Sequence, residues 1–240
     1  MPLMTMNRMS TARAATLVAA LSFCATAAIA TTAAAQSGNG SNALLARAMQ
    51  RYGAARTVDI AFTQVVSNPL TQHSLTSRGQ LQRQRPNLLS VSFSSPAADR
   101  IVDDGSALWV YLPSSAPGQV LKLPAAGAQG ILLDPLGQIL STPLSEYTVT
   151  NGADATIRGR ATHTFTLAPH STHALFTRAT LWIDDTGIVQ QLEATEPSGL
   201  VRRVTITQFR TNVSIPRSAF HFTPPEGIRI VDQAGRVGSQ

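Results

Sequence analysis

The sequence has few charged residues and almost no cysteine. Charged side chains make up 13% of its 240 residues, well below the quarter or so that is usual in soluble proteins. The one cysteine, Cys24, lies in an amino-terminal stretch that we expect to be removed, so the mature chain would contain no disulfide and no cysteine nucleophile. Without disulfides, such a chain must obtain its stability from the burial of its side chains alone.

The basic residues differ from those of a nucleic-acid-binding protein. Lys122 is the single lysine, and the arginines are spread along the chain without forming a run. A surface with so little charge suits an apolar ligand or a partner protein. We therefore predict no nucleic-acid partner.

The chain also lacks the motifs of common enzymes: there is no G-x-S-x-G elbow, no H-E-x-x-H, no P-loop and no glycine-rich dinucleotide turn. His170 and His173 are three residues apart in a polar stretch, but no cysteine or acidic ligand accompanies them. Asp103 and Asp104 precede a glycine, where aspartate is favoured for turn geometry. We predict that the protein is not an enzyme and holds no metal or cofactor.

The amino terminus has the features of a secretory signal peptide. Arg8 and Arg13 form a positive region, residues 14–29 are apolar, and small residues end at Ala35. We place cleavage after Ala35, with a cut after Ala30 as the alternative. No second apolar run of roughly 20 residues follows, so we expect an exported, soluble domain over residues 36–240.

The mature region begins with a helical pattern and then changes to an alternating one. The helix is predicted to start at Ser41 or Asn42 and to stop at Gly53. From Thr57 the period is two, with short turns, and the last predicted strand covers residues 219–223. The patterns add up to about eleven strands and two short helices, which favours a mainly β, single-domain fold: a strongly curved antiparallel sheet or incomplete barrel.

Residues 79–93 join two strand patterns at Pro86. After the proline, apolar side chains fall on one face and serines on the other. Pro86 favours an extended conformation for Arg85, which places a long cationic side chain at the rim of an apolar concave surface. Arg85 is therefore a candidate gate, and the alternative is a solvated arginine in an ordinary hairpin.

Residues 125–143 interrupt the strand pattern with apolar residues at helical spacing. Pro135, Gly137 and Pro143 fall within this stretch, so any helix here should be short and weakly held. An apolar short helix after a run of strands could be a lid over a cavity. The alternative is a crossover helix that plugs the sheet.

These motifs resemble those of the periplasmic outer-membrane lipoprotein carrier LolA family, in which they occur in the same order. They are Phe62-Thr63-Gln64, Gly79-x-Leu81, Arg85-Pro86-Asn87-Leu88, Asp104-Gly105-x-x-Leu108-Trp109-x-Tyr111 and Phe220-x-Phe222-Thr223-Pro224-Pro225-x-Gly227. The resemblance implies an unclosed antiparallel barrel covered by helices, whose apolar interior shelters the acyl chains of lipoproteins. It also implies a periplasmic location and two partners. These are the inner-membrane lipoprotein-releasing ABC transporter and the outer-membrane lipoprotein receptor.

The resemblance further implies that Arg85 holds the lid closed through hydrogen bonds to the lid backbone. Leu89 and Val91 stand where the family often has an aromatic residue at the cavity mouth. Leu89 follows the strand boundary closely and is expected at the mouth, with Phe93 deeper on the same face. The candidate cavity and mouth residues are Leu89, Val91, Phe93, Trp109, Tyr111, Leu132, Leu133, Leu136, Ile139 and Leu140.

Two other classes share the implied fold. The receptor of the same pathway is a lipoprotein, and Cys24 would have to be its lipidated residue, although bulky Phe23 precedes it. A related module that binds or senses another lipid is the second alternative, because a fold does not determine a function. We expect a monomeric carrier.

Overall fold

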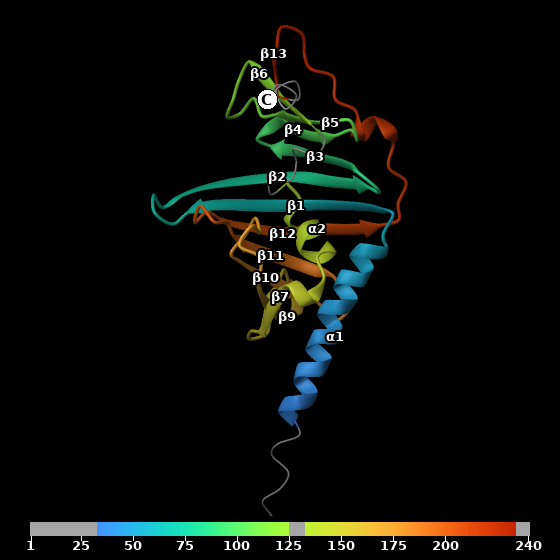
Figure 1. The fold of residues 1–240 in the computed structure, drawn as a ribbon, viewed down its shortest axis with the longest axis vertical. Helices are drawn as coiled ribbons and strands as arrows, with labels where there is room; N and C mark the ends of the chain where they lie inside the picture. Colours follow the sequence, from blue (N-terminus) through green and yellow to red (C-terminus); the bar gives the residue numbers. More distant parts are fainter. Residues whose placement is uncertain (1–32, 125–132, 234–240) are drawn as a thin grey trace, which may run out of the picture.

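The computed structural model describes residues 33–124 and 133–233, with side chains described from residue 42 onward. Within these residues the chain is mainly β, and one long sheet of 13 strands dominates it (Figure 1). The strands are β1 (Thr57–Asn68), β2 (His73–Gln84), β3 (Leu88–Ser95), β4 (Ala97–Asp103), β5 (Ala107–Tyr111), β6 (Gln119–Pro124), β7 (Tyr147–Asn151), β8 (Ala155–Ile157), β9 (Arg160–Pro169), β10 (Arg178–Ile183), β11 (Val189–Thr195), β12 (Val201–Thr211) and β13 (Arg229–Asp232).

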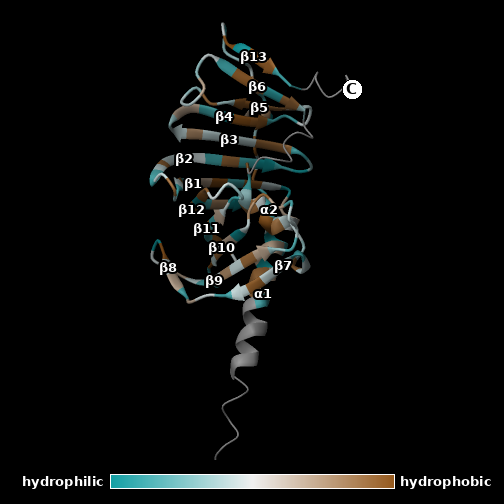
Figure 2. Cartoon of the chain, turned by 60° about the vertical axis from the view of Figure 1, so that its left-hand side comes forward, coloured by the Kyte–Doolittle hydropathy of each residue, from teal (hydrophilic) through white to brown (hydrophobic). Residues whose placement is uncertain are grey.

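The sheet is an unclosed barrel, as predicted. Its strand order is β13-β6-β5-β4-β3-β2-β1-β12-β11-β10-β9-β7, with β8 paired to β9. The outermost strands of this path, β13 and β7, are not paired with each other. Neighbouring strands are antiparallel except for β13 and β6, which run parallel. Hydrophobic and hydrophilic residues alternate along several strands (Figure 2), so each strand presents one face to the interior.

Two α-helices lie on one side of the sheet, namely α1 (Ala33–Ala54) and α2 (Pro135–Ser141). The first begins before the predicted cap at Ser41 or Asn42, because glycines weaken a helix without having to end it. It extends along the β9 and β10 end of the sheet (Figure 1). Its side chains reach the turn after β10. There Arg47 donates to the carbonyl of Asp185, and Arg51 to that of Thr186.

The predicted last strand at residues 219–223 is wrong. A short 3-10 helix, η3 (Arg217–Phe220), and an irregular segment occupy this part of the chain, and the final strand is β13. The alternation arises because Phe220 and Phe222 are buried, not because the backbone forms a ladder. Phe222 packs on the outer face of the sheet in a small second core with Val102 and Val120.

The main core lies on the inner face. Beneath α1, the strands β9 and β10 contribute Phe165, Leu167, Leu181 and Ile183, all fully buried. The helix adds buried residues, Leu45 among them, to the same cluster. This end of the molecule is therefore filled by side chains, whereas the inner face of the neighbouring strands is not.

Candidate functional site

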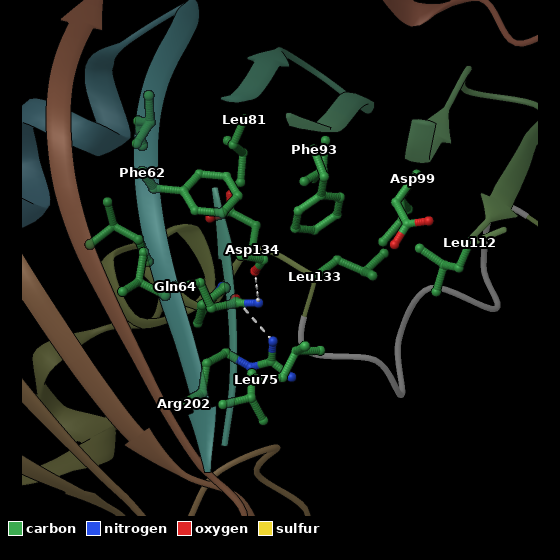
Figure 3. A pocket seen from close by; sticks show the side chains of 18 of the residues that line it. Phe62, Gln64, Leu75, Leu81, Phe93, Asp99, Leu112, Leu133, Asp134 and Arg202 are labelled. Carbon is green, nitrogen blue, oxygen red and sulfur yellow. Dashed lines mark hydrogen bonds between the residues drawn. The ribbon is translucent and has the colours of Figure 1, made fainter. Parts of the chain in front are cut away.

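A cavity of about 360 Å³ lies between the inner face of the sheet and the segment that leads into α2 (Figure 3). Most of its walls are apolar. The strands β1 to β4, β11 and β12 supply Ile60, Phe62, Val66, Leu75, Leu81, Val91, Phe93, Ile101, Leu192, Val204 and Ile206, and the α2 segment supplies Leu133, Pro135 and Leu136. Strand alternation explains why the cavity walls are mostly apolar, because every second residue of these strands faces inward and most of these residues are apolar.

A glycine on β2 makes room for two aromatic rings in the cavity wall. The rings of Phe62 and Phe93 meet edge to face, with centroids 5.9 Å apart. Gly79 lies between their strands, and a Cβ atom there would lie 2.5 Å from the carbonyl oxygen of Ser92 and 3.0 Å from Phe62. Gly79 therefore allows this close approach of β2, β3 and the rings.

Polar groups border the cavity in more than one place, with Gln64 and Arg202 on one side and Asp99 on another (Figure 3). Gln64 donates to Ser77 at 3.3 Å and accepts from Arg202 at 3.0 Å. Arg202 also forms an ion pair with Glu196 at 2.9 Å. On this side of the cavity the polar groups therefore bond to one another, and the charge of Arg202 is paired with that of Glu196.

The helix α2 is short but well anchored. Asp134 precedes it and accepts a hydrogen bond from the backbone N–H of Gly137 at 2.8 Å, which caps the helix. Pro135 stands in the first turn, where its missing N–H costs nothing, so the helix is not interrupted there. Ile139 and Leu140 are buried in the main core. The expectation of a weakly held helix is therefore corrected.

Asp134 also belongs to a charged cluster beside the cavity. Its Oδ2 atom accepts from the Tyr52 hydroxyl at 2.6 Å, and the Arg83 guanidinium donates to the same hydroxyl at 3.1 Å. Arg83 lies 3.9 Å from the Asp134 carboxylate and over the Tyr52 ring, 5.4 Å from its centroid. The cluster joins α1, β2 and the start of α2.

Electrostatics hold Tyr52 and Arg83 of this cluster each in one protonation state at neutral pH. Burial raises the pKa of Tyr52 well above its ordinary value, and the Asp134 carboxylate raises it further. Burial acts to lower the pKa of Arg83, but the interactions with Tyr52 and Asp134 outweigh it, so this pKa is raised. Tyr52 is thus neutral, and Arg83 is charged.

Arg85 lies elsewhere. It lies in the turn after β2 with an exposed side chain, and its Nε atom donates to the carbonyl of Ala55, just after α1, at 3.1 Å. It borders a separate polar cleft that includes Asn212 and Ser214. Within the part of the chain that the structure describes, none of its hydrogen bonds reaches α2. The lid contact expected of Arg85 is therefore not among its described contacts.

The remaining candidate residues divide into four groups. Val91, Phe93, Leu133 and Leu136 line the cavity. Leu89, Ile139 and Leu140 belong to the main core or pack against it, and they are not among the described residues that line the cavity. The place of Leu89 at the cavity mouth stays a prediction. Trp109 and Tyr111 pack against Phe222 on the outer face, which corrects their assignment to the cavity. Leu132 lies outside the described residues.

Sequence analysis missed the contributions of β1 and β12 to the wall, although their alternation contains the signal. It also missed the pairing of Arg83 with Tyr52 and Asp134. Arg83 is two residues after inward-facing Leu81, so the alternation alone points it inward. The identity of its partners depends on elements distant in the sequence.

Two features are absent from the described residues. Across residues 33–124 and 133–233, no cluster of three or more potential metal ligands is present. In the same residues, neither helix combines the length and hydropathy that a membrane crossing requires.

The fold and the cavity define a class of protein in which an open, curved antiparallel sheet surrounds an apolar chamber under a short helix. The family model described as outer membrane lipoprotein carrier protein LolA matches residues 53–223. The chain belongs to this family.

Individual relatives agree with the family model. An outer-membrane lipoprotein carrier protein of Serratia proteamaculans is 28% identical over 204 residues, which cover 82% of this chain and 94% of the relative. That of Haemophilus influenzae is 26% identical over 174 residues, covering 72% and 78%. Among solved structures, a LolA superfamily protein from Nitrosomonas europaea is 14% identical, with a TM-score of 0.38 and coverage of 75% of this chain and 97% of that one.

Proposed function

We propose that this protein carries acylated lipoproteins through the periplasm. It would receive them from an inner-membrane ABC transporter and deliver them to an outer-membrane receptor, after removal of a signal peptide over residues 1–35. The observation that carries the proposal is the apolar cavity beside α2 in a chain of the LolA family. The relatives' names, which call them outer-membrane lipoprotein carrier proteins, support it further.

The chemistry of the cavity suits acyl chains. Each buried CH₂ group contributes about 0.8 kcal/mol to binding, so several acyl chains in a permanently open apolar cavity would be released too slowly for a carrier. The cavity of about 360 Å³ is near the lower end of the range for drug-sized ligands. A lipid anchor with several chains is larger than such a ligand, so we infer that α2 moves when cargo binds. The free energy of closing then opposes binding.

The test uses a fluorescent lipopeptide with three acyl chains, and the deacylated peptide of the same sequence is the matched control. We expect only the acylated peptide to co-elute with the protein in size-exclusion chromatography. Leu133→Glu places a charge on the half-buried cavity wall and should weaken binding at least tenfold, or about 1.4 kcal/mol. Leu70→Glu, at a side chain that is 90% exposed, should leave binding unchanged.

Equal co-elution of the acylated and deacylated peptides would contradict the proposal, as would binding that is insensitive to Leu133→Glu. Denaturant unfolding of both variants checks that a loss of binding reflects the cavity and not loss of the fold.

A further inference from the structure

One buried carboxylate in the cavity wall has no partner of opposite charge among the described residues. Asp99, from β4, is 6% exposed and borders the cavity on a different side from Arg202 (Figure 3). Its described contacts are hydrogen bonds from the backbone N–H of Ser114, at 3.0 Å, and from the hydroxyl of the same serine. Aspartate is almost never buried to this extent without a cation beside it. Asp99 is therefore an exception in the wall of this cavity.

The other charged side chains in the described part of the wall are paired. Asp134 lies 3.9 Å from Arg83, and Arg202 lies 2.9 Å from Glu196. The opposite charges within each pair cancel. The negative charge of Asp99 is what remains.

Arg202 still has hydrogen-bond donors for a ligand. Its guanidinium makes three described hydrogen bonds, two to Glu196 and one to Gln64, which is fewer than its N–H groups. The Glu196 carboxylate cancels the positive charge close by, so an anion gains little from this arginine. A carbonyl oxygen of an ester or amide can accept from the remaining N–H groups without bringing a charge into the cavity.

We propose that this arrangement of charges selects uncharged acyl esters and amides over anionic lipids, with Asp99 as the residue that rejects the anion. The inference rests on the proposed function for its natural ligand, an anchor whose acyl chains are attached through ester and amide groups. A fatty-acid carboxylate or a lipid phosphate would meet the charge of Asp99 and would also lose its hydration. The apolar walls alone favour any acyl chain, so discrimination among lipids requires a repulsive group of this kind.

The first experiment uses cis-parinaric acid and its methyl ester, two fluorescent probes with the same acyl chain and different charge. At neutral pH we expect the wild-type protein to bind the ester at least roughly tenfold more tightly than the acid. The ester is also the more apolar probe, so the change of this ratio on mutation is the test. Asp99→Asn removes the charge and keeps an acceptor for Ser114. It should raise affinity for the acid roughly tenfold and leave affinity for the ester within about twofold.

The second variant, Glu196→Gln, changes the opposite pairing. Glutamine retains an oxygen that accepts from Arg202 but no longer cancels its charge, so the acid should again bind more tightly, by roughly fivefold. The matched control is Glu226→Gln, which makes the same change of charge at an exposed residue outside the cavity wall. It should leave both affinities unchanged. Urea unfolding checks the fold of each variant, and Glu196→Gln decides the test if Asp99→Asn is unfolded.

The outcomes separate charge selection from the carrier role. An ester-to-acid affinity ratio that is the same in the wild-type protein and in the folded cavity variants would overturn the selection, even where acylated lipopeptide binds. An equal change of the ratio in Glu226→Gln would also overturn it, because net charge alone would then be the cause. A ratio that changes only in the cavity variants, in a protein that does not bind acylated lipopeptide, would support the selection and overturn the proposed function.

Discussion

Two regions of the same sheet have similar patterns but different interiors. The filled region consists of β7, β9 and β10 under α1, where side chains such as Phe165 and Leu181 are fully buried. The hollow region consists of β1 to β4 and β12, whose inward side chains surround the cavity of about 360 Å³. Both regions alternate apolar and polar residues along their strands.

The difference lies in the element that covers each region. The helix α1 is 22 residues long and presents buried residues such as Leu45 and Ala48 to the filled region. The helix α2 has only 7 residues, and its Ile139 and Leu140 are buried in the core. The cavity wall formed by Leu81 and its neighbours is therefore left without a close cover. The cavity therefore results from a short cover, not from a special strand sequence.

The largest expected effect compares Leu181→Ala in the filled region with Leu81→Ala in the hollow one. Leu181→Ala should reduce the free energy of unfolding by about 2–5 kcal/mol, because it creates a new void among packed side chains. Leu81 already borders empty space and has fewer partners to lose, so Leu81→Ala should cost less than about 2 kcal/mol. Urea unfolding measures both, and equal losses would remove the distinction between the regions.

A smaller effect is expected at two glycines. Gly79→Ala should cost about 1–3 kcal/mol, because the new methyl group would collide with the Ser92 carbonyl and press on Phe62 in the hollow region. Gly53→Ala, in the last turn of α1, meets nothing within 4 Å and should stabilise the protein by up to about 1 kcal/mol. Thermal unfolding of the two variants gives the comparison. A stable Gly79→Ala variant would mean that the cavity wall yields easily.

The smallest effect concerns Asp104, in the turn between β4 and β5. Burial acts to raise its pKa, but hydrogen bonds from Ser106, Ala107 and Trp109 outweigh burial and lower the pKa to about 2. A depressed pKa in the folded state contributes stability above the unfolded value of about 4, and this contribution is lost as pH falls towards 2. Asp104→Asn should therefore be less stable than the wild-type protein at pH 7, and the gap should close between about pH 4 and pH 2.

The matched control for this pH series is Asp184→Asn, in the turn of the filled region. Burial also acts to raise the pKa of Asp184, and hydrogen bonds led by that of Thr186 lower it overall. Urea midpoints at several pH values should show the same direction of change for both variants. If the urea midpoints of the two variants changed with pH in opposite directions, the turns as well as the covering helices would distinguish the two regions.

The sequence by itself determined the class of fold and much of the cavity wall. Alternation placed Val91 and Phe93 on one inward face because successive side chains of a strand must point to opposite sides. The same rule failed for Trp109 and Tyr111, since it says which residues share a face but not which face is inside. It failed again at Phe222, whose burial comes from packing on the outer face.

Only the tertiary structure decided which arginine contacts the segment that covers the cavity. Arg83 and Arg85 differ by two residues, and nothing local to them states that Tyr52 and Asp134 lie near one and Ala55 near the other. These partners are 30 or more residues away in the chain, and strand pairing and helix packing bring them together. Hydrogen bonds and ion pairs depend on distance in space, so a pattern read along the chain could not identify the partners of either arginine.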